Sequence, residues 1–122
     1  MNPTWLPRLL GAATAAYSVA VLVRPSVFLR PTGLAARKPT PALAAATRAV
    51  AGRDLVSSVA MTIAPTGPAL RAAIAVRVGC DASDALLFAV ALRGRPQRVK
   101  VVGVAAGWGT LCGLSALTVP HE

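Results

Sequence analysis

Two apolar stretches of this 122-residue sequence contain charged groups that could do acid–base chemistry. Arg53 and Asp54 are adjacent in "VAGRDLVSSVA", and Arg77, Asp81 and Asp84 follow in "AVRVGCDASDALLFAVAL". In a helix the last three share one face, because their spacing is i, i+4 and i+7. General acid–base catalysis by a pair of carboxyl groups needs one that is protonated and another that is ionised. Asp81 and Asp84 are candidates for these two roles.

The other polar residues nearby receive supporting roles. Asp54 is the third candidate catalytic carboxylate, placed to orient an arginine. Arg53 and Arg77 are candidate binding residues that would hold a carboxylate and stabilise developing negative charge. On a helix Ser57 and Ser58 lie in the same broad arc as Arg53 and Asp54, as hydroxyl helpers. Arg48 points away from that arc, so we expect an anchor that reaches the membrane surface, or an outer partner.

The elements that carry these residues read as membrane helices. The chain is 55% hydrophobic and 14% charged, whereas soluble domains carry about a quarter charged residues. Four apolar runs of about 20 residues or more are each long enough to cross the hydrocarbon core as a helix. They cover about residues 4–23, 41–64, 68–92 and 99–119. We predict an all-α fold: one transmembrane domain, residues 1–122, built as an integral membrane four-helix bundle.

A short turn, "APTGP", joins the second and third runs, which must therefore be antiparallel. At a rise of about 1.5 Å per residue, opposite charges on the two helices fall at similar depths. The register predicts a polar ladder of three pairs: Arg48–Asp84, Arg53–Asp81 and Asp54–Arg77. Arg77 and Asp81, four residues apart, are also a possible pair within their own helix. Charges at membrane depth cost about 2.5–3.5 kcal/mol each on insertion scales, so they persist where they are paired or functional. The competing interpretation is structural: paired charges that fix helix register.

The distribution of basic residues predicts how the chain is oriented. The first loop holds Arg24, Arg30, Arg37 and Lys38, and the third holds Arg93, Arg95, Arg98 and Lys100. The positive-inside rule makes both loops cytoplasmic, so both termini are expected on the outer side of the cell (plasma) membrane. The abundance of Arg and Ala suggests a bacterial source. A cleaved signal peptide is the alternative for the first run, disfavoured by its weakly basic start.

The net charge of +9 is explained by these loops, so no nucleic-acid partner is expected. Cys80 and Cys112 lie in apolar runs outside any Cys/His cluster, which indicates buried structural thiols and no metal site. No cofactor is predicted. The expected partners are the lipid bilayer, a lipophilic small molecule and a second copy of the chain. That copy would pack through Gly-x-x-x-Gly faces, at Gly103/Gly107 and Gly109/Gly113.

The two charged segments also carry a family resemblance. "RAVAGRDLVSS", a following arginine (Arg71 or Arg77) and "CDASDALLFA" resemble a family of small, DoxX-like, four-helix membrane proteins of unknown function. The resemblance covers about residues 5–118. It implies a four-helix integral membrane protein and brings no substrate.

Three functions remain open from the sequence. The first is a small membrane protein with a buried Arg/Asp network that binds a lipophilic small molecule or a partner. The second is an intramembrane acid–base enzyme, an isomerase, cyclase or epoxide-opening enzyme, which requires an apolar cavity beside Asp81 and Asp84. The third is a small transporter. Small multidrug exporters resemble the chain in size but carry a carboxylate in the first span, which here has none.

Overall fold

The computed structural model describes residues 4–34 and 40–120, and all regular secondary structure in these residues is helical. Five α-helices and a 3₁₀ turn follow one another: α1 (Trp5–Val23), α2 (Ser26–Thr32), α3 (Pro41–Ile63), α4 (Pro68–Ala91), α5 (Gln97–Ser115) and η1 (Ala116–Thr118). The all-α prediction is confirmed, and the four long helices occupy nearly the predicted ranges. Helix α2 was not predicted, because its residues were taken for a basic loop. Arg37 and Lys38 lie outside the described residues.

Local signals in the sequence set the helix boundaries. Pro41 and Pro68 open α3 and α4, where a missing backbone N–H costs nothing. The Thr40 side chain accepts a hydrogen bond from the backbone N–H of Leu43 at 3.2 Å and so caps α3. Gly67, at φ 116°, makes the tight turn between the two helices. Gly33 ends α2 in the left-handed conformation, at φ 74°.

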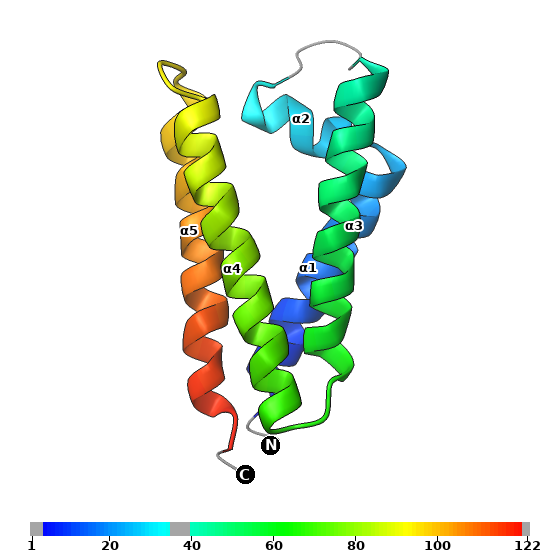
Figure 1. The fold of residues 1–122 in the computed structure, drawn as a ribbon, viewed down its shortest axis with the longest axis vertical. Helices are drawn as coiled ribbons and strands as arrows, with labels where there is room; N and C mark the ends of the chain where they lie inside the picture. The colour runs from blue at the N-terminus through cyan, green and yellow to red at the C-terminus, as the bar shows by residue number, and fades with distance from the viewer. Residues whose placement is uncertain (1–3, 35–39, 121–122) are drawn as a thin grey trace.

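The long helices form two closely packed pairs. Helix α1 packs along α3 and α4 packs along α5, whereas α3 and α4 contact each other less extensively. A glycine lies at the close approach within each pair. A Cβ added at Gly11 would come within 2.8 Å of the Ser58 carbonyl oxygen, and one at Gly109 within 2.9 Å of Asp81 Cβ. Figure 1 shows the two pairs close together at the end where α1 begins and diverging toward α2.

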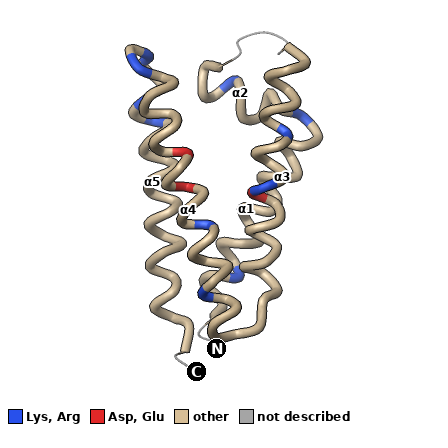
Figure 2. Tube along the Cα trace, in the orientation of Figure 1, with Lys and Arg blue, Asp and Glu red and all other residues tan. Residues whose placement is uncertain are grey.

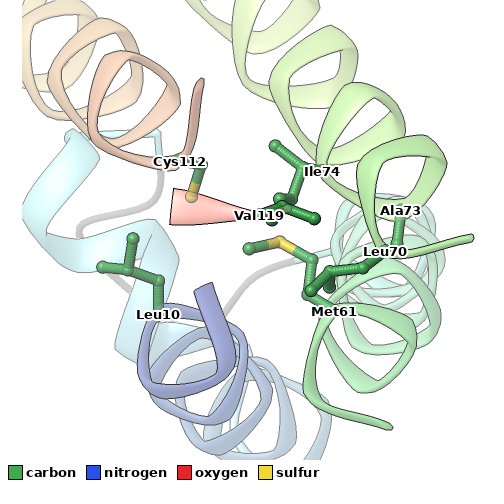
Figure 3. Close-up of a cluster of buried hydrophobic side chains, with 7 residues drawn as sticks. All are labelled: Leu10, Met61, Leu70, Ala73, Ile74, Cys112 and Val119. Atoms are coloured by element: carbon green, nitrogen blue, oxygen red, sulfur yellow. The ribbon is translucent and has the colours of Figure 1, made fainter. Parts of the chain in front are cut away.

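The apolar core lies where the pairs meet. Its buried side chains come from four long helices and the end of the chain (Figure 3): Leu10, Met61, Leu70, Ala73, Ile74, Cys112 and Val119. The prediction of a buried thiol therefore holds for Cys112, which is fully buried. It was wrong in part for Cys80, which is half-buried. Cys80 sits one residue before Asp81 and so lies on a different face of α4.

The outer surface of the four long helices is apolar. Val23, Val56, Leu86 and Val99, one from each of α1, α3, α4 and α5, are between 72% and 82% exposed. By length and composition, two of the helices in residues 4–34 and 40–120 are able to cross a membrane: Trp5–Val23 and Gln97–Thr118. Only 33% of the first stretch and 17% of the second is buried inside the protein, so neither resembles the enclosed core helix of a globular domain.

Arginine side chains from other elements satisfy the carbonyl groups at the C-terminal ends of the helices. A helix end leaves such carbonyls without intrahelical partners and carries a partial negative charge. Arg8 binds the end of α3, donating to the carbonyl oxygens of Thr62 at 3.1 Å and Ala64 at 2.6 Å. The remaining contacts of this kind are Arg48–Leu22 on α1, Arg95–Gly33 on α2, Arg98–Ala89 on α4 and Arg71–Val119 after η1. Figure 2 shows basic residues along the whole fold, not only at one end.

The small-residue motifs divide between the inside and the outside of the molecule. Gly109 and Gly113 of α5 face α4, and a Cβ at Gly113 would lie 3.6 Å from Val78. Gly103 and Gly107 have open space beside them. The Gly109/Gly113 motif therefore serves packing within the chain, and the prediction of a second copy rests on Gly103 and Gly107.

Candidate functional site

A cavity of about 600 Å³ lies between the two helix pairs, on the α2 side of the apolar core. Pockets for small molecules commonly measure roughly 300–1,000 Å³ and are mostly apolar with a few convergent polar groups. This cavity has that composition. Its apolar and aromatic walls come from all five helices, and its charged lining residues are Asp54, Arg77, Asp81, Asp84 and Lys100.

Arg77 is the centre of the polar part of the wall. Its side chain is 1% exposed. It binds Asp81 with two hydrogen bonds, Nη2 to Oδ1 at 2.7 Å and Nε to Oδ2 at 3.2 Å. The same Nη2 lies 3.1 Å from Asp54 Oδ1, and Nη1 donates to Ser57 Oγ at 3.1 Å. The planar guanidinium thus joins two carboxylates and a hydroxyl group across α3 and α4.

Arg53 makes the second bridge between α3 and α4. Its Nη2 lies 2.8 Å from Asp54 Oδ1 and 2.9 Å from Asp84 Oδ2. Both oxygens of Asp84 accept hydrogen bonds from this nitrogen. The Arg53 side chain is 37% exposed and also borders a second, shallow groove on the outside of α3 and α4. The network therefore separates the cavity from that groove.

Among the three carboxylates of the network, one oxygen accepts no hydrogen bond from the described residues. Both oxygens of Asp81 bind Arg77, and both oxygens of Asp84 bind Arg53. Asp54 uses only Oδ1, which lies between the two arginines. Within residues 4–34 and 40–120, Asp54 Oδ2 has no hydrogen-bond partner. The Asp54 side chain is 21% exposed and lines the cavity, so it offers an acceptor to a bound molecule or a site for a proton.

One of the three predicted ion pairs is present. Asp54 pairs with Arg77, as the register predicts. The pairing Arg53–Asp81 was wrong: Arg53 binds Asp84, while Asp81 is taken by Arg77 four residues earlier on its own helix. An arginine side chain extends along the helix axis, so equal depth of the backbone does not fix which carboxylate it meets.

The predicted pair Arg48–Asp84 was also wrong. Arg48 donates its Nε–H to the Leu22 carbonyl oxygen at 3.0 Å, at the last turn of α1, and is exposed. Its direction away from the other charges was predicted correctly. Ser57 takes part in the network through Arg77, as expected for a hydroxyl helper. Ser58 does not: it is buried against α1 at Gly11 and donates to the Leu55 carbonyl oxygen.

Sequence reasoning missed the aromatic part of the wall. Tyr17 and Trp108 line the cavity from α1 and α5. The indole N–H of Trp108 donates to Thr14 Oγ1 at 2.8 Å, and this hydrogen bond links α5 to α1. A signal was available, because Thr14, Tyr17, Ser18 and Val21 are spaced i, i+3, i+4 and i+7 and so form one helix face. No role was assigned to that face from the sequence.

Phe28 of α2 and Phe88 of α4 line the cavity and are in contact with each other. Their ring centroids are 5.6 Å apart and the rings are tilted by 50°, an attractive geometry for aromatic pairs. The short helix α2 thus touches α4 through this ring pair, packs against α1 and α5, and contributes Phe28, Pro31 and Thr32 to the wall.

The described residues include no group of three His, Cys, Asp or Glu side chains arranged to hold a metal ion. Comparison of the chain with protein-family models, with curated proteins and with solved structures gave no match. The resemblance to DoxX-like proteins therefore stays a prediction, and the functional argument rests on the geometry of the cavity.

Proposed function

We propose that this chain is a multi-pass protein of the cell membrane that binds a lipophilic small molecule in the cavity between its two helix pairs. The apolar part of the molecule would contact the helix walls, and its polar end would contact the Arg/Asp network. The observation that carries the proposal is the cavity itself, about 600 Å³ in volume, which joins an apolar interior to Asp54, Arg77, Asp81 and Asp84.

The surface of the molecule supports the membrane part of the proposal. Exposed apolar side chains occur on all four long helices, including the two whose charged residues make them less apolar overall. Those charges face the cavity and the contact between α3 and α4, as expected for ionisable residues within a membrane. The proposed topology has four spans, α1, α3, α4 and α5, with both termini extracytoplasmic and α2 on the cytoplasmic side.

A pair of reporter fusions tests this topology. Alkaline phosphatase is active only outside the cytoplasm, so a fusion after Glu122 should be active and a fusion in the turn at Gly94 inactive. Green fluorescent protein at the same two positions should give the opposite pattern. An active phosphatase at Gly94 would overturn the proposed orientation.

The ligand is tested by filling the cavity. Ala105 lines the cavity from α5, and its neighbour Ala106 is exposed and lies outside it. Ala105→Phe should therefore exclude a bound molecule, whereas Ala106→Phe adds the same side chain to the outer surface. Both variants and the wild type are purified from membranes, extracted with organic solvent and analysed by mass spectrometry.

We expect a lipophilic compound that copurifies with the wild type and with Ala106→Phe, and that falls at least about tenfold in Ala105→Phe, as an occluded pocket requires. Equal amounts of every extracted compound in the two variants would overturn the proposal. Thermal unfolding of each variant shows whether Ala105→Phe has folded, and Ala105→Leu, a smaller filling, replaces it if it has not.

The second candidate is an intramembrane acid–base enzyme, an isomerase, cyclase or epoxide-opening enzyme acting on a lipophilic metabolite. The specific observation in its favour is that Arg77 joins Asp54 and Asp81 at the cavity wall, with one oxygen of Asp54 open. A proton on that oxygen would make Asp54 the acid, while the Arg77-bound Asp81 stays ionised as the base.

Comparison of ligands bound to wild type and Asp54→Asn separates catalysis from binding. An enzyme that has lost its acid should accumulate substrate, so the variant should yield a compound that differs from the wild-type compound in mass or chromatographic retention. Epoxide opening by water would appear as a mass difference of one water molecule. The same compound in both proteins supports a binding protein.

A further inference from the structure

We infer that the cavity selects a lipophilic ligand that carries a single positive charge, such as a protonated amine or a quaternary ammonium, and that Asp54 receives this charge. The inference rests on the proposed ligand-binding function and names the class of ligand. Three features carry it: the charge balance of the network, the carboxylate oxygen of Asp54 that accepts no hydrogen bond from the described residues, and the aromatic residues that line the same cavity.

The network is one positive charge short. Three carboxylates, Asp54, Asp81 and Asp84, share two guanidinium groups, Arg53 and Arg77. Each arginine already contacts two of the carboxylates, so the missing positive charge does not arise because an arginine lies too far from the network. An uncompensated charge is costly where water is excluded. The network therefore favours a further cation, which is either a proton or the charged end of a ligand.

The geometry directs that cation to Asp54. It has the only carboxylate oxygen of the three that accepts no hydrogen bond from the described residues. Its Oδ1 is held by Arg53 and Arg77 together, so the side chain is fixed in place before a ligand arrives. A preorganised acceptor loses little entropy on binding.

The other charged residue of the cavity wall lies far from this position. Lys100 is nine residues before Gly109, whose backbone touches Asp81, so about 13 Å of α5 separates them along the helix axis. Lys100 is exposed at the start of α5. The polar end near Asp54 therefore keeps its net negative charge, and an anionic headgroup would be disfavoured there.

The aromatic wall suits a cation as well. Tyr17 and Trp108 line the cavity together with Asp54. Trp108 is held by its hydrogen bond to Thr14. The faces of tyrosine and tryptophan attract organic cations, more strongly where the cation has lost its water. A carboxylate and aromatic rings that line the same cavity can thus receive an alkylammonium group, while the apolar walls accept its hydrocarbon part.

Three probes of equal chain length test the charge preference: dodecyltrimethylammonium, 1-dodecanol and dodecanoate. The chain has two tryptophans, so Trp5→Phe leaves Trp108 as the only indole and makes it a reporter within the cavity. Each probe is titrated into this protein in phosphatidylcholine nanodiscs, and tryptophan emission is recorded. The same titrations are made with Asp54→Asn and Asp54→Glu added, so that partition of the probe into lipid is common to every protein.

We expect the dissociation constant of dodecyltrimethylammonium to be at least about tenfold lower than that of 1-dodecanol. A difference of this size is typical of contacts with a charged group. Dodecanoate should bind most weakly. Asp54→Asn should remove the preference for the cation while affinity for the alcohol stays the same. Asp54→Glu should restore it. Ala105→Phe should weaken binding of every probe, which places the probes in the cavity.

Two results would overturn the inference without touching the proposed function. One is that 1-dodecanol binds as tightly as the cation and Ala105→Phe weakens both, which means that a proton neutralises the network and the ligand is neutral. The other is that Asp54→Asn keeps the preference for the cation. Emission changes that are equal in wild type and Ala105→Phe for every probe would instead count against the cavity as a binding site, and the proposed function would fail with the inference.

Discussion

The seam between α3 and α4 and the interfaces within the two helix pairs are held together by different kinds of contact. Within the pairs, glycines bring backbones together: Gly11 of α1 touches α3, and Gly109 of α5 touches α4. At the seam, Arg53 and Arg77 join α3 to α4 through carboxylates, and a cavity lies on one side with a shallow groove on the other. The close contacts hold each pair together, and the charged contacts set how the pairs face each other.

This difference separates residues needed for folding from residues available for function. In a bilayer, the setting proposed for this chain, helix association depends on close packing and hydrogen bonding, because lipid is as apolar as the helix surface. The glycine interfaces satisfy that requirement without any charged group. The network carries an extra carboxylate beyond its arginines, which a purely structural ion-pair cluster would not need. The comparison predicts that arginines and aspartates of the seam respond unequally to substitution.

The largest effect is expected at Arg77. Arg77→Gln leaves Asp54 and Asp81 without their shared counterion, and loss of one partner from a buried ion pair costs about 3–5 kcal/mol. Asp84→Asn changes the network in the opposite direction, since it leaves two carboxylates for two guanidinium groups. Because Arg53 is 37% exposed, this substitution should cost less than about 1 kcal/mol or be stabilising. Thermal unfolding in detergent compares the two.

Asp81→Asn is the third member of this set. Its carboxylate holds Arg77 through two hydrogen bonds, so its loss should fall between the other two. Strong destabilisation by every aspartate substitution would show that the seam is needed for folding in the same way as the pair interfaces. The proposed difference between the two regions would then be wrong.

An intermediate effect is expected at the glycine contacts. Gly11→Ala puts a methyl group within 2.8 Å of the Ser58 carbonyl oxygen, a backbone atom that cannot move alone. Overpacking of this kind costs about 1–3 kcal/mol. Gly107→Ala is the matched control, because nothing lies within 4 Å of that position and alanine is the better helix former. Unfolding temperatures should fall for the first and hold or rise for the second. Equal behaviour would mean that the pairs are not held by this contact.

Much of the fold could be predicted because its signals are local. Apolar runs bounded by proline and basic residues gave the four long helices, and the "PTGP" turn made α3 and α4 antiparallel. Helix α2 could not be predicted, because it is short and contains Pro31. Neither its length nor its composition indicates a helix. The cavity could only be stated as a requirement of one hypothesis, since its walls come from five helices.

The side-chain partners could be predicted only in part. The pair Asp54–Arg77 followed from helix register, but the long side chain of Arg53 reaches past the level of Asp81 to Asp84. The contacts of the other arginines were not predicted at all. Arg8 and Ala64, or Arg95 and Gly33, are far apart in the sequence, and no local pattern joins them. Residues read only as determinants of orientation also bind the ends of neighbouring helices.

The smallest effect is expected at Arg95. It distinguishes the two roles of the basic residues, which are to orient the chain and to bind the end of a neighbouring helix. Arg95 donates to the Gly33 carbonyl oxygen at 3.0 Å, where α2 ends. Arg93, in the same turn, makes no side-chain hydrogen bond with the described residues. Arg95→Ala and Arg93→Ala each remove one positive charge from the turn, so any effect on orientation is common to both. Because the contact is exposed, its loss should cost no more than about 0.5–1 kcal/mol.

The local consequence should be clearer than the global one. Amide hydrogen exchange in residues 26–33 should accelerate in Arg95→Ala and stay at the wild-type rate in Arg93→Ala, while exchange in α1 and α3 is unchanged in both. Helix α2 would then be held in the cavity wall in part by the contact Arg95–Gly33, in addition to the ring pair Phe28–Phe88 and its packing against α1 and α5. Equal exchange in the two variants would show that the ring contact and the packing against α1 and α5 hold it without Arg95.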